Sequence, residues 1–391
     1  MFSLLLAVIY MSFISLGLPD SLLGSGWPVM HLELGAPISF AGVIAMIIAV
    51  QTIISSLLSD RLTRRFGAGL VTAVSVCTTA VALLGFSLSE HVWQLCLWAI
   101  PYGLGAGAVD AALNNFVALH YAARHMSWLH CFWGVGTSVS PFIMSYCLTK
   151  ELGWEMGYRA VFFIQIVLSV LLFVSLPLWK KKAAEHNSAE EAVEAVPLGV
   201  RGALKIKGVK YVLFAFFCYC AIESTAGLWA SSYLVEYRGC DAETAARFAS
   251  LFYLGITFGR FVNGFVADKL GDKLLIRVGT LTIIGGIVLV GVPFHQVFAL
   301  VGLVVIGIGC APVYPSVIHA TPDNFGRENS QAIVGIQMAS AYLGTTLMPP
   351  LFGLVANHIN IGFYPLFLVI IAGVMLFVTE ALNRMKLGKV S

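Results

Sequence analysis

The chain has 391 residues, of which 59% are hydrophobic and only 11% are charged, and its formal net charge is +3 at pH 7. Soluble domains carry roughly 25% charged residues, so this composition excludes an ordinary soluble globular protein. We therefore use the positions of its apolar runs to predict the structural elements.

Apolar runs of about 20 residues with few charges are typical of helices that cross ~30 Å of hydrocarbon. In chain order, the predicted spans are 2–25, 39–59, 69–89, 92–121, 127–148, 158–179, 209–234, 244–267, 274–292, 295–320, 330–354 and 361–383. The first run has no basic n-region and no small-residue cleavage site, so we interpret it as a span and not as a removable signal peptide. The sequence thus predicts an all-helical membrane protein with twelve transmembrane helices.

Lysine and arginine are distributed unevenly over the predicted connections. With the N-terminus in the cytoplasm, the 23 Lys and Arg residues fall on cytoplasmic connections or on the C-terminal tail, except for Lys150, Arg159, Arg238, Arg247 and Arg260. Cytoplasmic loops are enriched in basic residues, so we expect both termini inside and the protein in the cell membrane. The net positive charge then reflects topology and gives no support for nucleic-acid binding.

The longest polar interval, 180–208, separates the first six predicted spans from the last six. It contains Lys180–Lys182, then four glutamates, then a second basic group. Such a charged stretch is typical of a solvated tether, although a docking role for it remains an alternative. We expect an N-terminal bundle at 1–179, a cytoplasmic linker at 180–208 and a C-terminal bundle at 209–391.

A short polar motif occurs twice, each time directly after an apolar run. The two copies contain Asp60, Arg61, Arg64 and Arg65, and then Asp268, Lys269 and Lys273. Asp60 and Asp268 are 208 residues apart, and the same offset carries Gly136 onto Gly344 and Pro141 onto Pro349. So long a period indicates two copies of one bundle, which is the usual construction of secondary transporters.

These two loops resemble the signature of the major facilitator superfamily, roughly Gly-x-Leu-Ala-Asp-Arg-x-Gly-Arg-Arg. The second copy keeps Gly264, Ala267, Asp268, Gly271 and Lys273, whereas the first has Ser56 and Thr63 where glycines are expected. The resemblance covers nearly the whole chain and implies two pseudo-symmetric six-helix bundles. An Asp at the inner end of a span accepts hydrogen bonds from a neighbouring helix N-terminus and pairs with Arg. We therefore expect both loops to latch an inner gate.

Three acidic residues, Asp20, Asp110 and Glu223, lie inside predicted spans. Acids in such positions are costly and mark ion or substrate paths, and burial disfavours their charged form, so we expect these three acids, together with Arg260, to carry the proton coupling. In the resembled family the first, fourth, seventh and tenth spans line the central cavity, so all three would face it. Arg260 lies about 12 Å above the inner end of its helix at 1.5 Å per residue, so we expect it to pair with Asp110 or Glu223. The structural alternative is that these residues are buried hydrogen-bond partners.

The segment 105–116 resembles the fourth-span motif of the fucose permease branch of sugar–proton symporters. That motif has a carboxylate followed four residues later by Asn, and Asp110 and Asn114 match it on one helical face. The branch also has an Asp late in its first span, as Asp20 is here. Segments 129–136, 223–233 and 307–315 look like the same branch. The chain departs from it in having Asp110 where fucose permease has Glu, and Asn115 where it has Pro.

A sugar presents hydroxyls to hydrogen-bonding side chains and C–H faces to aromatic rings. The residues that could supply these contacts lie on cavity-facing or interface spans: Gln51, Asn114, Asn115, His130, Trp133, Trp229, Asn263, Tyr314 and Gln337. For each aromatic residue the alternative is ordinary helix packing. The predicted function is proton-coupled uptake of a monosaccharide, or a related small polar solute, by a monomer in the lipid bilayer.

Other functions fit the sequence less well. A drug–proton antiporter of the same fold usually has a Gly-Pro-x-x-Gly-Gly bend, which 140–145 lacks, and a transport-incompetent sugar sensor would be expected to carry a long terminal extension. An enzyme is disfavoured because the sequence has no nucleophile–base pair and no phosphate-binding loop. His120, His125 and His130 recur every five residues, about 140° apart on a helix, so they cannot converge on one metal ion. We expect no metal and no cofactor.

Overall fold

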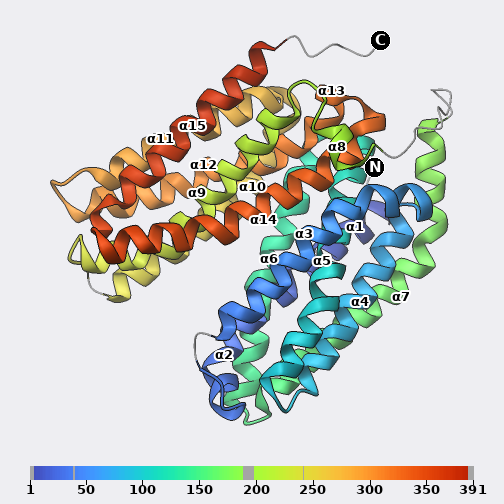
Figure 1. Ribbon diagram of the computed structural model, residues 1–391, viewed down its shortest axis with the longest axis horizontal. Helices are drawn as coiled ribbons and strands as arrows, with labels where there is room; N and C mark the ends of the chain where they lie inside the picture. Colours follow the sequence, from blue (N-terminus) through green and yellow to red (C-terminus); the bar gives the residue numbers. More distant parts are fainter. Residues whose placement is uncertain (1–3, 38–39, 188–197, 241, 386–391) are drawn as a thin grey trace. The chain divides into compact units, whose positions relative to one another are not determined.

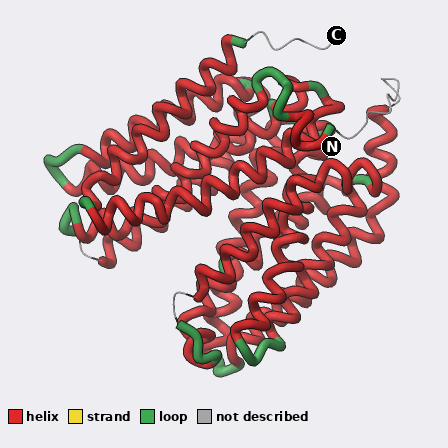
Figure 2. Tube along the Cα trace, viewed as in Figure 1, coloured by secondary structure: helices red, strands yellow, loops and turns green. Residues whose placement is uncertain are grey.

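The computed structural model describes residues 4–37, 40–187, 198–240 and 242–385, and helices account for nearly all of them (Figure 1). Figure 2 shows helices joined by short loops, with no strand in the described part of the chain. The predicted all-helical fold is therefore confirmed.

The chain divides into two compact units, and the first comprises Met1–His120 and Leu129–Gly199. Its helices are α1 (Leu4–Asp20), α2 (Leu22–Glu33), α3 (Phe40–Phe66), α4 (Ala68–Ser87), α5 (Val92–His120), most of α6 (Ala123–Thr149) and α7 (Gly153–Asn187). Within this unit α5 packs against α3 and α4, and α4 also packs against α7. A hydrophobic cluster of this unit contains side chains from α1–α7, Trp154 and Tyr158 among them.

The second unit comprises Val200–Ser391 together with Tyr121–Trp128, the segment that leads into and begins α6. Its elements are α8 (Gly199–Ala203), α9 (Val209–Glu236), α10 (Ala242–Leu270), α11 (Asp272–Gly291), α12 (Gln296–His319), α13 (Thr321–Phe325), α14 (Arg327–His358), the 3₁₀ turn η1 (Ile361–Phe363) and α15 (Tyr364–Arg384). Here α12 packs against α10 and α11. This repeats the packing of α5 against α3 and α4, as expected for a duplicated bundle.

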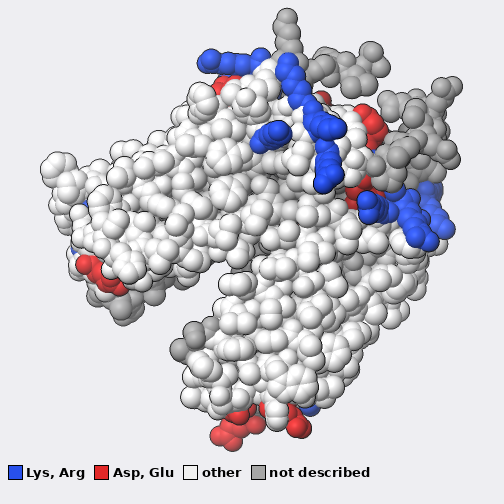
Figure 3. Space-filling model, viewed as in Figure 1, with Lys and Arg blue, Asp and Glu red and all other residues white. Residues whose placement is uncertain are grey.

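Ten stretches of the described residues are long and apolar enough to cross a membrane, counting Leu4–Trp27 of α1 and α2 as one. The helices α6 and α10 have 27 and 29 residues, which is sufficient length, but their polar side chains lower their hydropathy. Charged side chains gather at helix ends, and the visible flanks between those ends are almost free of them (Figure 3). The protein is therefore a multi-pass membrane protein.

The span predicted at 2–25 corresponds to the single apolar stretch Leu4–Trp27, and within it the helix is interrupted once, since α1 ends at Asp20 and α2 begins at Leu22. Pro19 has no N–H to donate to the carbonyl one turn earlier, which belongs to Ser15. Gln165 of α7 compensates by donating from Nε2 to that carbonyl at 2.8 Å, and Thr79 of α4 donates to Gln165 Oε1 at 3.2 Å. The carbonyl that Pro19 leaves free is thus hydrogen-bonded to α7, and through Gln165 to α4, close to Asp20.

The first residues of the predicted linker are helical. The helix α7 continues through Lys180–Lys182 as far as Asn187, because its polar end is still a good helix former. The middle of the linker, 188–197, lies outside the described residues, and the short helix α8 follows at Gly199–Ala203.

Glycines let the middle of α5 approach its neighbours closely. A side chain at Gly107 would collide with the carbonyl oxygen of Thr52 in α3, and one at Gly105 would collide with that of Ser75 in α4. Ser56 Oγ donates to the Gly107 carbonyl at 3.3 Å. Close contact of small residues is how helices associate without a hydrophobic driving force, and it holds the turn that carries Asp110.

We expect Gly107→Ala to lower the stability of the purified protein. The added methyl group must push α3 away from α5, and overpacking of this kind costs roughly 1–3 kcal/mol. Gly42→Ala in α3 is the matched control, because a side chain there meets nothing within 4 Å. Thermal unfolding in detergent would measure both, and equal melting temperatures for the two variants would contradict the close approach.

Candidate functional site

The first polar cluster surrounds Asp110 of α5 and lies within the first unit. Asn114, one turn later, donates from Nδ2 to Asp110 Oδ1 at 2.7 Å and to the Asp110 carbonyl at 3.0 Å. From α6, His130 Nε2 lies 3.0 Å from Asn114 Oδ1. Asp110 and His130 are each 5% exposed and Asn114 is fully buried. One acid and two residues predicted as substrate ligands thus form a single hydrogen-bonded chain.

The second cluster surrounds Asp20 at the end of α1. Tyr102 of α5 donates its hydroxyl to Asp20 Oδ1 at 3.1 Å, and Trp133 of α6 donates from Nε1 to Asp20 Oδ2 at 3.0 Å. In contrast to Asp110, Asp20 reaches the surface of its unit. Tyr102 was not predicted as a site residue. Its position two helical turns before Asp110 on the same helix was the signal that could have identified it.

Close contact between α1 and α6 places Trp133 beside Asp20. A side chain at Gly17 would collide with the carbonyl oxygen of Trp133, and one at Gly136 would collide with that of Ile14. Because both positions are glycine, the two backbones touch and the indole lies next to the end of α1.

The third cluster lies within the second unit, where Arg260 of α10 approaches Glu223 of α9. Arg260 Nη2 is 3.6 Å from Glu223 Oε1, and the Arg260 side chain is almost completely buried. The guanidinium also lies over the ring of Tyr314, 5.8 Å from its centre. Its buried Nε–H has no hydrogen-bond partner among the described residues. Of the two acids predicted as partners of Arg260, the structure places Glu223 beside it.

Four other predicted ligands lie outside these clusters. Trp229 donates from Nε1 to the Pro349 carbonyl at 3.0 Å and packs edge-on against Phe352, so it lies in the interface of α9 with α14. Gln337 is fully buried and accepts a hydrogen bond from Thr321 at 3.0 Å. Asn115 is buried in α5. Gln51 lies in α3 and is partly buried.

The fourth cluster is formed by the last part of α10 and the beginning of α6, which both belong to the second unit. Asp268 accepts a hydrogen bond from the backbone N–H of Arg124 at 3.0 Å and forms an ion pair with the Arg124 side chain. Asn263, predicted as a substrate ligand, donates instead to Ser127 Oγ at 2.7 Å. Trp128 donates from Nε1 to the Phe261 carbonyl at 3.2 Å. An acid at a helix N-terminus with an Arg partner is the arrangement predicted for a latch.

The corresponding motif of the first unit lies in the last turns of α3 and has different contacts. Asp60 Oδ1 accepts from Arg64 Nε at 2.7 Å, one turn away in the same helix, and Asp60 Oδ2 is buried without a hydrogen bond in the described structure. Arg65 lies over the ring of Phe66, 5.2 Å from its centre. The other basic residues predicted for gating are all exposed: Arg61, Lys269 and Lys273.

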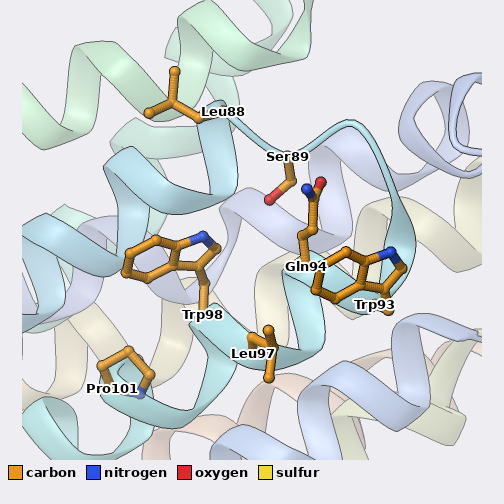
Figure 4. Close-up of a pocket in the computed structure, with 7 residues that line it drawn as sticks. All are labelled: Leu88, Ser89, Trp93, Gln94, Leu97, Trp98 and Pro101. Carbon is orange, nitrogen blue, oxygen red and sulfur yellow. The ribbon is translucent and has the colours of Figure 1, made fainter.

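A cavity of about 410 Å³ lies within the first unit at the turn between α4 and α5 (Figure 4). It is lined by Leu88, Ser89, Trp93, Gln94, Leu97, Trp98 and Pro101. None of the predicted site residues lines it. Indoles near the ends of apolar helices are typical of the membrane–water interface, so we assign this cavity to the membrane boundary and not to a substrate.

Comparison with known proteins gives an independent view of the chain. The family model described as Major Facilitator Superfamily matches residues 9–286 and 212–384. The protein is 24% identical over 352 residues to bypass of stop codon protein 6 of Saccharomyces cerevisiae, which covers 80% of this chain and 69% of that relative. It is 22% identical over 302 residues to the glucose/mannose transporter GlcP of Bacillus subtilis, covering 75% of this chain and 74% of the relative.

Among solved structures, the chain resembles the fucose:proton symporter FucP of E. coli. One crystal structure of FucP, in the outward conformation, superposes with a TM-score of 0.80 over 98% of this chain and 99% of that chain. The sequence identity is 14%. At this identity the likeness establishes the fold.

Proposed function

Because the chain belongs to the Major Facilitator Superfamily, we propose that it is a proton-coupled transporter that takes up a monosaccharide or a related small polar solute by alternating access. We place it in the cell membrane as a monomer with both termini in the cytoplasm, as the distribution of basic residues indicates. The carbohydrate named for its relative GlcP supports this class of solute.

The observation that carries this proposal is the presence of two different carboxylates in one unit. Asp20 reaches the surface and is held by Tyr102 and Trp133, a set of groups that suits hydroxyls and a C–H face. Asp110 is buried and bonded to an amide, an environment that suits a group which binds and releases a proton. We assign solute binding to the Asp20 cluster and proton coupling to Asp110.

A second candidate function is uptake of a small anion. Arg260 is a buried cation whose Nε–H has no hydrogen-bond partner in the described part of the chain, and Glu223 is its neighbour. If Glu223 bound a proton, the guanidinium would be left to bind an anion with that N–H. If the solute is an anion, Arg260 of the second unit would bind it; if the solute is a sugar, the Asp20 cluster of the first unit would bind it.

Uptake into liposomes under an imposed pH gradient tests these assignments. The panel should contain neutral monosaccharides, nitrate and a small dicarboxylate, and the melting temperature of the purified protein should be measured with each, since a ligand of the native state raises it. Gradient-driven uptake of a sugar supports the first candidate, and that of an anion supports the second. Efflux of hydrophobic cations alone would favour a drug antiporter, and binding without any transport would favour a sensor.

We expect Trp133→Phe to weaken sugar binding several-fold. The substitution keeps an aromatic ring but removes the N–H that donates to Asp20, and one hydrogen bond contributes about 0.5–1.5 kcal/mol. Trp93→Phe is the matched control, because Trp93 lines the separate cavity between α4 and α5. Titration of sugar binding would measure both, and equal affinities in the two variants would remove Trp133 from the binding site.

A further inference from the structure

The hydrogen-bonded chain through Asn114 has a direction that is set by the chemistry of its two neighbours. An amide has a donor end and an acceptor end, whereas an ionised carboxylate can only accept. Asn114 directs Nδ2 to Asp110 Oδ1 and Oδ1 to His130 Nε2, at 2.7 and 3.0 Å. In this orientation His130 must donate from Nε2–H, and the amide stabilises Asp110 in its ionised form.

The opposite orientation of the amide would suit the other protonation state of Asp110. If the amide turned over, its oxygen would face Asp110, which could then only donate a hydrogen bond from a protonated carboxyl group. His130 Nε2 would have to accept from the amide nitrogen. The His130 proton thus selects between an amide that favours the charged acid and one that favours the neutral acid.

We propose that His130 is a positioning residue for proton coupling, which holds the Asn114 amide in the orientation that lets Asp110 release its proton. This inference rests on the proposed function, because it requires Asp110 to carry the coupled proton. It also replaces the expectation that His130 binds the solute. The imidazole is 5% exposed, and its ring packs edge-on against Phe13 of α1, with 5.3 Å between ring centres.

Two substitutions separate this role from a structural one. His130→Gln keeps an N–H that reaches the Asn114 oxygen from about the same place, whereas His130→Phe keeps a planar ring against Phe13 but has no donor. The Phe variant should exchange labelled for unlabelled solute and lose gradient-driven accumulation about tenfold, as expected when a hydrogen bond that supports an ionised group is lost. The Gln variant should still accumulate solute.

The outcomes are distinct from those that test the proposed function. If Asp110→Asn abolishes accumulation but His130→Phe does not, the positioning role is wrong and the coupling role of Asp110 stands. If Asp110→Asn itself accumulates solute, the proposed coupling mechanism is wrong. A purely structural His130 would lower exchange and accumulation together in both His130 variants.

A measurement on the unmodified protein avoids any dependence on the folding of a variant. The chain has nine histidines, and ¹⁵N-histidine spectra compared with those of His130→Gln would identify the His130 signals. We expect a proton on His130 Nε2 at a pH where Asp110 is ionised. An Nε2 that carries no proton under those conditions would overturn the proposal.

Discussion

Asp110→Asn should exchange labelled for unlabelled solute across a membrane and fail to concentrate that solute against a gradient. The substitution preserves the shape of the side chain and its capacity for hydrogen bonding but mimics the protonated acid permanently. Exchange requires no release of the proton, whereas net accumulation requires the empty carrier to lose it and return. With one proton per solute, a gradient of about one pH unit can drive about tenfold accumulation, and the variant should show none.

Two other acids serve as controls for this experiment. Glu223→Gln and Asp20→Asn remove the carboxylates of the other two clusters, and only the residue that carries the coupled proton should give exchange without accumulation. An Asp110→Asn protein that still concentrates solute under an imposed pH gradient would show that a different group carries the proton.

Asp268→Asn should slow net transport about tenfold while solute affinity in detergent changes little. The substitution removes the ion pair with the Arg124 side chain and weakens the hydrogen bond to the Arg124 N–H, and hydrogen bonds to charged groups contribute roughly 1.5–3 kcal/mol. If these contacts latch an inner gate, the closed state becomes less populated and the carrier returns more slowly. Rates of uptake and binding isotherms together measure the effect.

The neighbouring Lys269 provides the control for the latch. It carries a charge in the same loop and is exposed, so Lys269→Gln should leave the rate of uptake close to that of the unmodified protein. Normal expression and unchanged uptake in Asp268→Asn would remove the latch role from this loop.

The helices could be predicted because a membrane span appears in the sequence as a run of about 20 apolar residues. The predicted spans match the long helices to within a few residues at most ends, since each end coincides with a change from apolar to polar sequence. The interruption after Asp20 lies inside the single apolar stretch Leu4–Trp27, because Pro19 is tolerated inside a membrane helix when another side chain binds the freed carbonyl. Gln165, which does so here, lies on α7, far away in sequence.

Predictions for the candidate site succeeded where the geometry is local. Asp110 and Asn114 are four residues apart on one helix, so their contact followed from helical periodicity. His130, Tyr102 and Arg124 have partners on other helices, and spacing along the chain carries no information about those contacts. Trp229 was predicted as a solute ligand, but its N–H is directed at the Pro349 carbonyl. The sequence could not indicate this contact, because the two residues lie on different helices.

The segment Tyr121–Trp128 has a consequence for dividing the protein into fragments. Although it precedes the linker in the sequence, its contacts group it with the C-terminal unit. Two polypeptides separated within the linker would not be self-contained halves, because the first would carry a stretch that groups by its contacts with the second. Ser127 and Trp128 would then provide a recognition surface for reassembly, through Asn263 and the Phe261 carbonyl. Co-expressed fragments should therefore associate without a covalent connection.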